Sequence, residues 1–265
     1  MNITLFKKEI KGSVKPLIVF AAILSMYISM IIWMYDPELS KAIKQFEEVM
    51  PEMMAAVGMT DSGTTLIEFI SSYLYGMILL VFPMVFIIIR SNALVAKYID
   101  RGSMASLLAS PVKRITVIST QIAALIVSVL ILITYCTVLE ISVSAVLFPD
   151  ENIVKDILML NSALLALHLF ISSLCFLFSC IFSDTKYSIG FGAGIPTLMY
   201  VLQMLANMGG KLEDVKYFTF FTLFNPNGII NAESTAVTGA VILFVSSVIL
   251  FALSAVIFKN KDLHI

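Results

Sequence analysis

Charged residues divide this chain into long apolar stretches separated by short polar segments. Six stretches lack Asp, Glu, Lys and Arg; they are residues 16–35, 69–89, 115–139, 157–183, 187–210 and 234–258. As a helix, each is long enough to cross about 30 Å of hydrocarbon, which takes about 20 residues. Strands of a membrane barrel would alternate polar and apolar positions over about 10 residues, and no stretch does so. The pattern predicts an all-α membrane protein with six transmembrane helices.

The third of these spans is predicted to be longer than its charge-free stretch. It continues past Glu140 to residue 148, because Pro149 is the first residue that ends a helix there. On this assignment Glu140 and Glu68 lie in the outer headgroup region. The whole chain, residues 1–265, is then one six-span domain.

Composition excludes several other classes of protein. Hydrophobic residues make up 59% of the 265 residues and charged residues only 13%, with a mean hydropathy of +0.97. A soluble domain carries about 25% charged residues. The formal net charge of −1 and the lack of a basic tail also exclude nucleic acid as a partner.

The basic residues are distributed unequally between the two sides of the membrane. Twelve of the 17 fall on one side: Lys7, Lys8, Lys11, Lys15, Arg90, Lys97, Arg101, Lys113, Arg114, Lys186, Lys259 and Lys261. Cytoplasmic loops carry such an excess. We expect a multi-pass protein of a bacterial plasma membrane with both termini in the cytoplasm.

Residues 2–14 are predicted to form a short amphipathic elbow helix. The apolar positions Ile3, Phe6, Ile10 and Val14 share one face, and three lysines lie opposite. Such a helix lies in the membrane interface and contacts lipid headgroups.

Two other groups of residues are candidate functional sites. Met50, Met53, Met54 and Met59 could ligate copper(I) through their thioethers, but Met is also a flexible apolar filler. Because no Cys or His joins these residues in the sequence, we predict no metal site. His168, in the middle of the fourth span, is a candidate functional group by default, but a lone neutral His also packs against neighbouring helices, and we favour packing.

Two further features remain, one in the fifth span and one in the outer segment after it. Gly190 and Gly194 form a small-xxx-small pair that predicts close helix packing or a subunit contact. Five aromatic residues within 217–224, followed by a turn at 225–228, suggest an interfacial or re-entrant helix.

The longest cytoplasmic loop, residues 90–114, is predicted to hold two short helical pieces parted at Gly102 and Ser103. The second piece would expose Met104, Leu107 and Leu108. Such a helix suits a groove on a cytoplasmic partner, and the alternative is a surface helix that contacts headgroups only.

In this loop the chain resembles the permease subunits of type-2 ABC exporters, the six-span family with the type V fold. The family's loop reads acidic-x-Gly-Thr/Ser, then Leu-Leu-x-x-Pro and a basic residue. The matching residues are Asp100, Gly102, Ser103, Leu107, Leu108, Pro111 and Arg114. The family often carries a Glu earlier in the loop, where this chain has Lys97 or Tyr98.

Two further stretches carry the resemblance. The last span of the family ends in Phe-x-x-basic-Asp-Leu, matched by Phe258, Lys261, Asp262 and Leu263. An outer Phe-Thr-Leu-Phe-x-Pro stretch is matched at residues 221–226. These motifs are degenerate, and they support a family and not a substrate.

The resemblance implies a homodimer or heterodimer of permease subunits, each docked on a separate ATP-binding subunit. Loop 92–112 would be the coupling helix, with these docking residues: Asp100, Arg101, Gly102, Ser103, Met104, Leu107, Leu108 and Pro111. ATP-driven closure would push on this loop and on the elbow, and would tilt the second and fifth spans.

The chain itself is expected to be neither an enzyme nor a cofactor-binding protein. It lacks the Gly-x-x-x-x-Gly-Lys-Ser/Thr loop that holds phosphates, so ATP and Mg²⁺ would be bound by the partner. The alternative is a secondary carrier or channel. Carriers place charges at the membrane midplane, where this sequence offers only His168 and some hydroxyls and amides.

Overall fold

The computed structural model describes residues 1–36, 49–58, 65–108 and 112–261, which are nearly all helical and contain no strand. Six helical segments are long and apolar enough to cross a membrane. They are α1 (Ile3–Met34), the composite segment Leu66–Asp100, α8 (Arg114–Leu147), α9 (Val154–Ile181), α10 (Thr185–Asn207) and α12 (Ser234–Asn260). The prediction of an all-α protein with six spans is confirmed.

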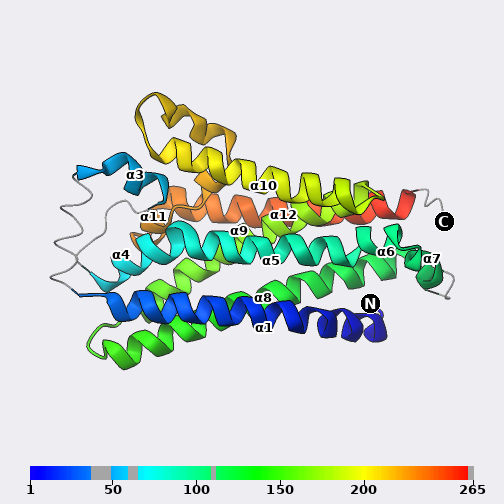
Figure 1. Cartoon of the computed structure of the whole chain (residues 1–265), viewed down its shortest axis with the longest axis horizontal. Coiled ribbons are helices and arrows are strands. Elements are labelled where there is room, and N and C mark those ends of the chain that lie inside the picture. The colour runs from blue at the N-terminus through cyan, green and yellow to red at the C-terminus, as the bar shows by residue number, and fades with distance from the viewer. Residues whose placement is uncertain (37–48, 59–64, 109–111, 262–265) are drawn as a thin grey trace.

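The spans lie alongside one another in one bundle (Figure 1). The first turn of α1 and the last turn of α12 lie at the same end, which we call the terminal end. The opposite end, which we call the far end, carries α3 (Pro51–Ala56), α4 (Leu66–Ile70) and α11 (Pro226–Ile230). This arrangement agrees with an even number of spans.

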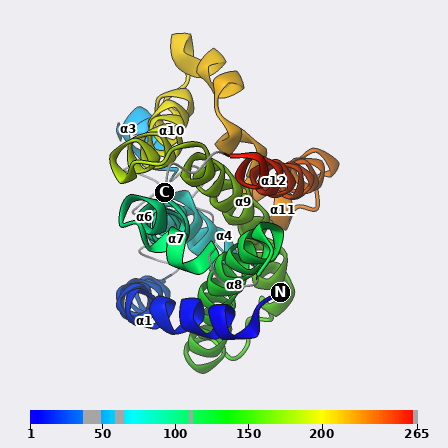
Figure 2. The ribbon, with the colours of Figure 1, turned by 90° about the vertical axis from the view of Figure 1, so that its right-hand side faces the viewer.

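Helix α9 forms the centre of the bundle. In its most apolar window 72% of the residues are buried, against 22% for α10 and 28% for α12. It packs against α12, α10, α8 and α5 (Leu79–Leu94), and Figure 2 shows it between them when the bundle is viewed from the terminal end. The peripheral helices therefore present apolar side chains outward, as lipid requires.

The second span contains an irregular segment. Between α4 and α5 lies the π-helix η1 (Ser71–Ile78). A backbone from the far end approaches it closely: a Cβ atom added to Gly76 would lie 3.0 Å from the carbonyl oxygens of Val57 and Gly58. Wide turns of this kind are frequent at functional sites.

The elbow is part of α1 and not a separate helix. Figure 2 shows the first turns of α1 crossing the terminal end toward α8, so that the helix bends within its length. Pro16 lies inside α1, lacks a backbone N–H and kinks such helices. The Asn2 amide donates to Thr120 Oγ1 on α8 at 2.9 Å, which fixes the start of the elbow.

The elbow packs on the bundle through a different face from the predicted apolar one. Ile3 is 62% exposed and Val14 is exposed, whereas Leu5, Glu9 and Ser13 are buried. The buried positions follow a spacing of four residues, so they share a face, but two of them are polar. Polar partners on α5 and α8, described below, explain why this face turns inward.

The aromatic stretch at the far end folds into parts of two 3₁₀ helices and not into one continuous helix. These are η2 (Gly210–Phe218) and η3 (Phe220–Leu223). Phe221 and Phe224 are buried against the bundle, whereas Tyr217 and Phe218 are more than 70% exposed. The second part of the stretch therefore packs against the bundle, and the first part projects from it.

Candidate functional site

The loop at the terminal end contains two short helices, as predicted. These are α6 (Ala96–Asp100) and α7 (Ser103–Leu108). Gly102 joins them with a φ of +68°, a left-handed conformation that glycine adopts without strain. Ser103 Oγ donates to the Tyr98 carbonyl at 3.2 Å across this turn.

The predicted docking residues do not share one surface. Asp100, Arg101, Gly102 and Ser103 are exposed, whereas Met104 is only 1% exposed. Leu107 is half-buried and packs against the core. The predicted exposure of Met104 is wrong, because α7 turns this side of the helix onto the bundle. The side chain of Leu108 and all of Pro111 lie outside the described residues.

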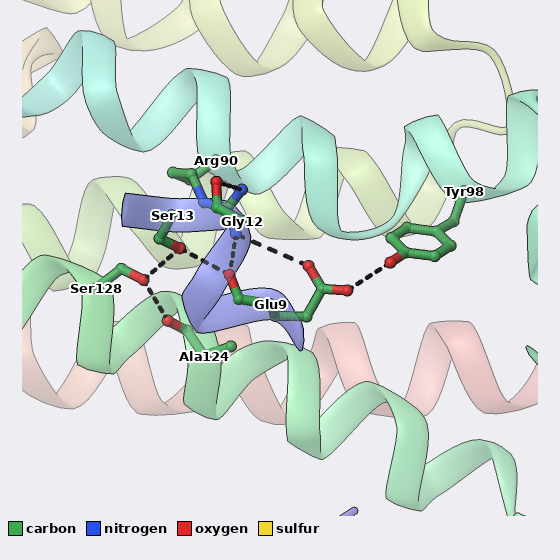
Figure 3. A network of polar contacts seen from close by, with 7 residues as sticks. All are labelled: Glu9, Gly12, Ser13, Arg90, Tyr98, Ala124 and Ser128. Atoms are coloured by element: carbon green, nitrogen blue, oxygen red, sulfur yellow. Dashed lines mark hydrogen bonds and ion pairs between the residues drawn. The ribbon is translucent and has the colours of Figure 1, made fainter. Parts of the chain in front are cut away.

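A buried polar network joins the elbow to the second span (Figure 3). Arg90 of α5 places Nη2 3.8 Å from Glu9 Oε2 and donates to the Glu9 carbonyl at 3.1 Å. Its Nη1 donates to the Gly12 carbonyl at 3.4 Å. The Tyr98 hydroxyl donates to Glu9 Oε1 at 2.5 Å. The network therefore connects α1, α5 and α6.

Pro16 explains why this network forms here. In a regular helix the Gly12 carbonyl accepts from the amide four residues later, but residue 16 is a proline and has no N–H. The Gly12 carbonyl therefore has no amide partner in the next turn, and it accepts from the Arg90 guanidinium instead. Glu9 and Arg90 are each 5% exposed, so each charge depends on the other, because an unpaired charge is costly to bury.

A second set of contacts holds the elbow to α8. Ser128 Oγ lies 2.9 Å from Ser13 Oγ and 2.7 Å from the Ala124 carbonyl, and its single hydroxyl proton is shared between these two acceptors. Ser13 Oγ donates to the Glu9 carbonyl at 3.1 Å. The residues in these contacts appear with Arg90 and Tyr98 in Figure 3. Sequence reasoning missed this site, although the spacing of Leu5, Glu9 and Ser13 was a readable signal.

Lys261, the last described residue, links three helices at the terminal end. Lys261 Nζ donates to the Cys180 and Ile181 carbonyls at 3.0 Å each, so it caps the end of α9. Burial lowers the pKa of this ammonium group. Arg114 Nη1 donates to the Lys261 carbonyl at 2.9 Å. Asp262 and Leu263 of the same motif lie outside the described residues.

Toward the far end, Glu140 is fully buried inside the bundle. Its Oε2 accepts from the Tyr75 hydroxyl at 2.8 Å and from Asn161 Nδ2 at 2.9 Å. Tyr75 belongs to η1 and Asn161 to α9, so the carboxyl group of Glu140 lies between neighbouring helices.

A polar cavity of about 310 Å³ lies beside this cluster. Tyr75 lines it from η1 and Tyr200 lines it from α10. Its other polar side chains are Ser71, Ser72, Gln203, Asn207, Lys216, Thr222, Asn225 and Asn227. The second and fifth spans thus enclose a space rich in hydroxyl and amide groups.

The remaining candidate residues lie in different surroundings. His168 is fully buried and its Nδ1 lies 2.9 Å from the Leu164 carbonyl of its own helix. Gly190 and Gly194 lie on an exposed face, where an added Cβ atom would meet nothing within 4 Å. The close contact of α10 is made instead by Gly192, whose carbonyl accepts from Cys175 Sγ at 3.0 Å. Gly190 and Gly194 therefore do not make the predicted close helix contact with the described part of this chain.

Comparison with known proteins adds one positive result. The family model described as ABC-2 family transporter protein matches residues 3–263. No curated protein and no solved structure matches the chain. The match covers all six spans together with the elbow and the loop that holds α6 and α7.

Proposed function

Because the chain belongs to the ABC-2 family of transporter proteins, we propose that it is the permease subunit of an ATP-driven exporter. It is a multi-pass ABC transporter permease, and this family works with an ABC ATP-binding subunit. We propose further that two permease subunits form the path, as a homodimer or heterodimer of type V fold. The terminal end would then face the cytoplasm. The observation that carries the proposal is the family match over residues 3–263.

Docking on the ATP-binding subunit is assigned to α6 and α7. These helices lie at the terminal end, and their exposed turn carries Asp100, Arg101 and Ser103. This turn lies next to α7, which Met104 anchors to the bundle, so it offers the partner a rigid surface. Met104 and Leu107 hold α7 to the bundle, so the contact with the partner is left to the polar turn and to the rest of the loop.

The network around Arg90 supports a path for the mechanical signal. A push on α6 would act on Tyr98 and, through the Glu9 carboxylate, on the elbow. It would also act along α5, which continues through η1 to the far end. Each nucleotide state of the partner would favour one arrangement of the second span, which is alternating access by rigid-body movement.

The exposed face of α10 is assigned to the second permease subunit. Gly190 and Gly194 leave this face flat, and apolar neighbours such as Ile189 and Leu198 are exposed beside them. Small residues let helices approach closely in a membrane. A Gly194→Trp variant is expected to weaken the dimer, whereas Ile189→Leu, on the same exposed helix, is expected to leave it intact.

The test is purification of the chain from its host membrane and a search for a bound ATP-binding subunit with ATPase activity. We expect a variant with Asp100→Arg and Arg101→Glu to lose that subunit at least tenfold. Lys259→Glu, an exposed charge reversal at the same end, is the matched control and is expected to retain it. Retention by both variants contradicts the docking assignment, and transport by the reconstituted chain without ATP contradicts the function.

A further inference from the structure

A carboxyl group lies inside the membrane-spanning bundle, where the proposed function assigns it no role. Glu140 and Tyr75 are fully buried and Asn161 is 4% exposed. The three residues come from the third, second and fourth spans, so they tie three helices together. A charged carboxylate in such a place is costly unless a cation or several donors compensate it.

The hydrogen bonds of Glu140 are divided unequally between its two oxygens. Oε2 accepts two, from the Tyr75 hydroxyl and from Asn161 Nδ2. Oε1 accepts none from the described residues, and Asn161 Oδ1 also has no donor there. A carboxylic acid shows this asymmetry, because its carbonyl oxygen accepts while its hydroxyl oxygen carries the proton. A proton would also supply the donor that the cluster lacks.

No described cation compensates Glu140. The ionisable groups that act on it are the Tyr75 hydroxyl from η1 and the Cys136 thiol, one turn earlier on α8. From α9 it meets the neutral amide of Asn161, and His168 lies about two turns further along that helix. Among the described residues of α1, α5 and α12, which also pack against α8, none pairs with Glu140.

The cluster has an approach from the far end. Tyr75 donates to Glu140 and also lines the polar cavity between η1 and α10. On the proposed topology this cavity belongs to the outer half of the membrane. Tyr75 is the described residue of η1 that bonds to Glu140, so its ring stands between the carboxyl group and the cavity.

We propose that Glu140 is a proton-binding site, protonated while the second, third and fourth spans are packed together and exchanging its proton with the polar cavity past Tyr75. On release, the proton passes to water in the cavity and leaves a carboxylate. That negative charge has only two neutral donors, so it disfavours the packed arrangement. Proton binding from the outer side therefore stabilises the packed state. The site stands on the geometry of the chain and does not depend on the ATP-driven mechanism.

Infrared difference spectroscopy of the full chain in lipid bilayers tests the proposal directly. The spectrum of Glu140→Gln is subtracted from that of the natural chain at neutral pH. We expect the natural chain to show the C=O band of a protonated carboxylic acid, lost completely in the variant, and we expect the band to decrease as the pH is raised. A carboxylate band in its place at neutral pH overturns the proposal.

Labelling with dicyclohexylcarbodiimide gives a second measurement, because this apolar reagent modifies protonated carboxyl groups within membranes. We expect mass spectrometry to find the adduct on Glu140, with a yield at least fivefold lower at high pH. Glu9, buried beside Arg90, is the internal comparison and is expected to remain unlabelled. Tyr75→Phe is expected to raise the labelling rate of Glu140, since the ring is no longer held by its hydrogen bond to the carboxyl group. A yield on Glu140 that does not vary with pH overturns the proposal.

Discussion

Among the residues that the structure describes, two carboxyl groups are buried, and their surroundings differ. Glu9, near the terminal end, is 5% exposed and lies 3.8 Å from the Arg90 guanidinium. Glu140, toward the far end, is fully buried, and its hydrogen-bond partners among the described residues are the hydroxyl of Tyr75 and the amide of Asn161. Burial is alike, but the partners differ: a cation faces the first group, and neutral donors face the second. Four predictions separate the two sites.

The largest effect is expected at the ion pair. Arg90→Ala leaves the Glu9 carboxylate buried beside Tyr98 without a cation, and breaking such a pair costs about 3–5 kcal/mol. The measurement is reversible unfolding of the chain in detergent micelles. In a Glu9→Gln background the same change is expected to cost less than half as much. An equal cost in both backgrounds would show that the two side chains are not coupled.

The next effect is expected from Glu9→Gln itself. The amide keeps the size of the side chain but removes the negative charge that faces Arg90 and accepts from Tyr98. Hydrogen bonds to charged groups contribute about 1.5–3 kcal/mol, and we expect a loss of unfolding free energy in that range. Lys11→Gln, an exposed charge on the same helix, is the control and is expected to change stability by less than about 0.5 kcal/mol.

A smaller effect is expected from Tyr75→Phe. The change removes one of the two hydrogen bonds to Glu140, and a buried acceptor left with one donor fewer costs about 1–2 kcal/mol. Tyr200→Phe is the matched control, because the Tyr200 hydroxyl is buried but bonds to no described residue. If both variants lose the same unfolding free energy, the hydrogen bond from Tyr75 to Glu140 does not contribute to stability.

The smallest effect is expected from Glu140→Gln. If the carboxyl group is already neutral, an amide of the same shape replaces it at a cost below about 1 kcal/mol, as in other volume-conserving exchanges. Stability of the natural chain is expected to fall as the pH rises, because only the folded state holds the proton, and the variant is expected to lack this slope. A loss as large as that of Glu9→Gln would remove the distinction between the two sites.

Other positions show where sequence reasoning stops. The periodicity of residues 103–108 predicts a short helix but not which side faces the bundle, and Met104 lies on the buried side. The pair Gly190 and Gly194 predicts a close approach, yet Gly192 makes it, because rotation of α10 is set by its neighbours. Glycine spacing identifies a flat face and cannot identify what covers it.

The sequence by itself determined the number of spans, the ends of most helices and the loop that carries α6 and α7. These features follow from short-range physics: apolar runs of sufficient length must be helical in lipid, and charges must lie outside it. Only the tertiary structure decided the partners of Glu9, the burial of Glu140 and the cavity between the second and fifth spans. Each joins residues from different helices, and a charge in the sequence does not reveal whether a neighbouring helix supplies a cation, a neutral donor or lipid.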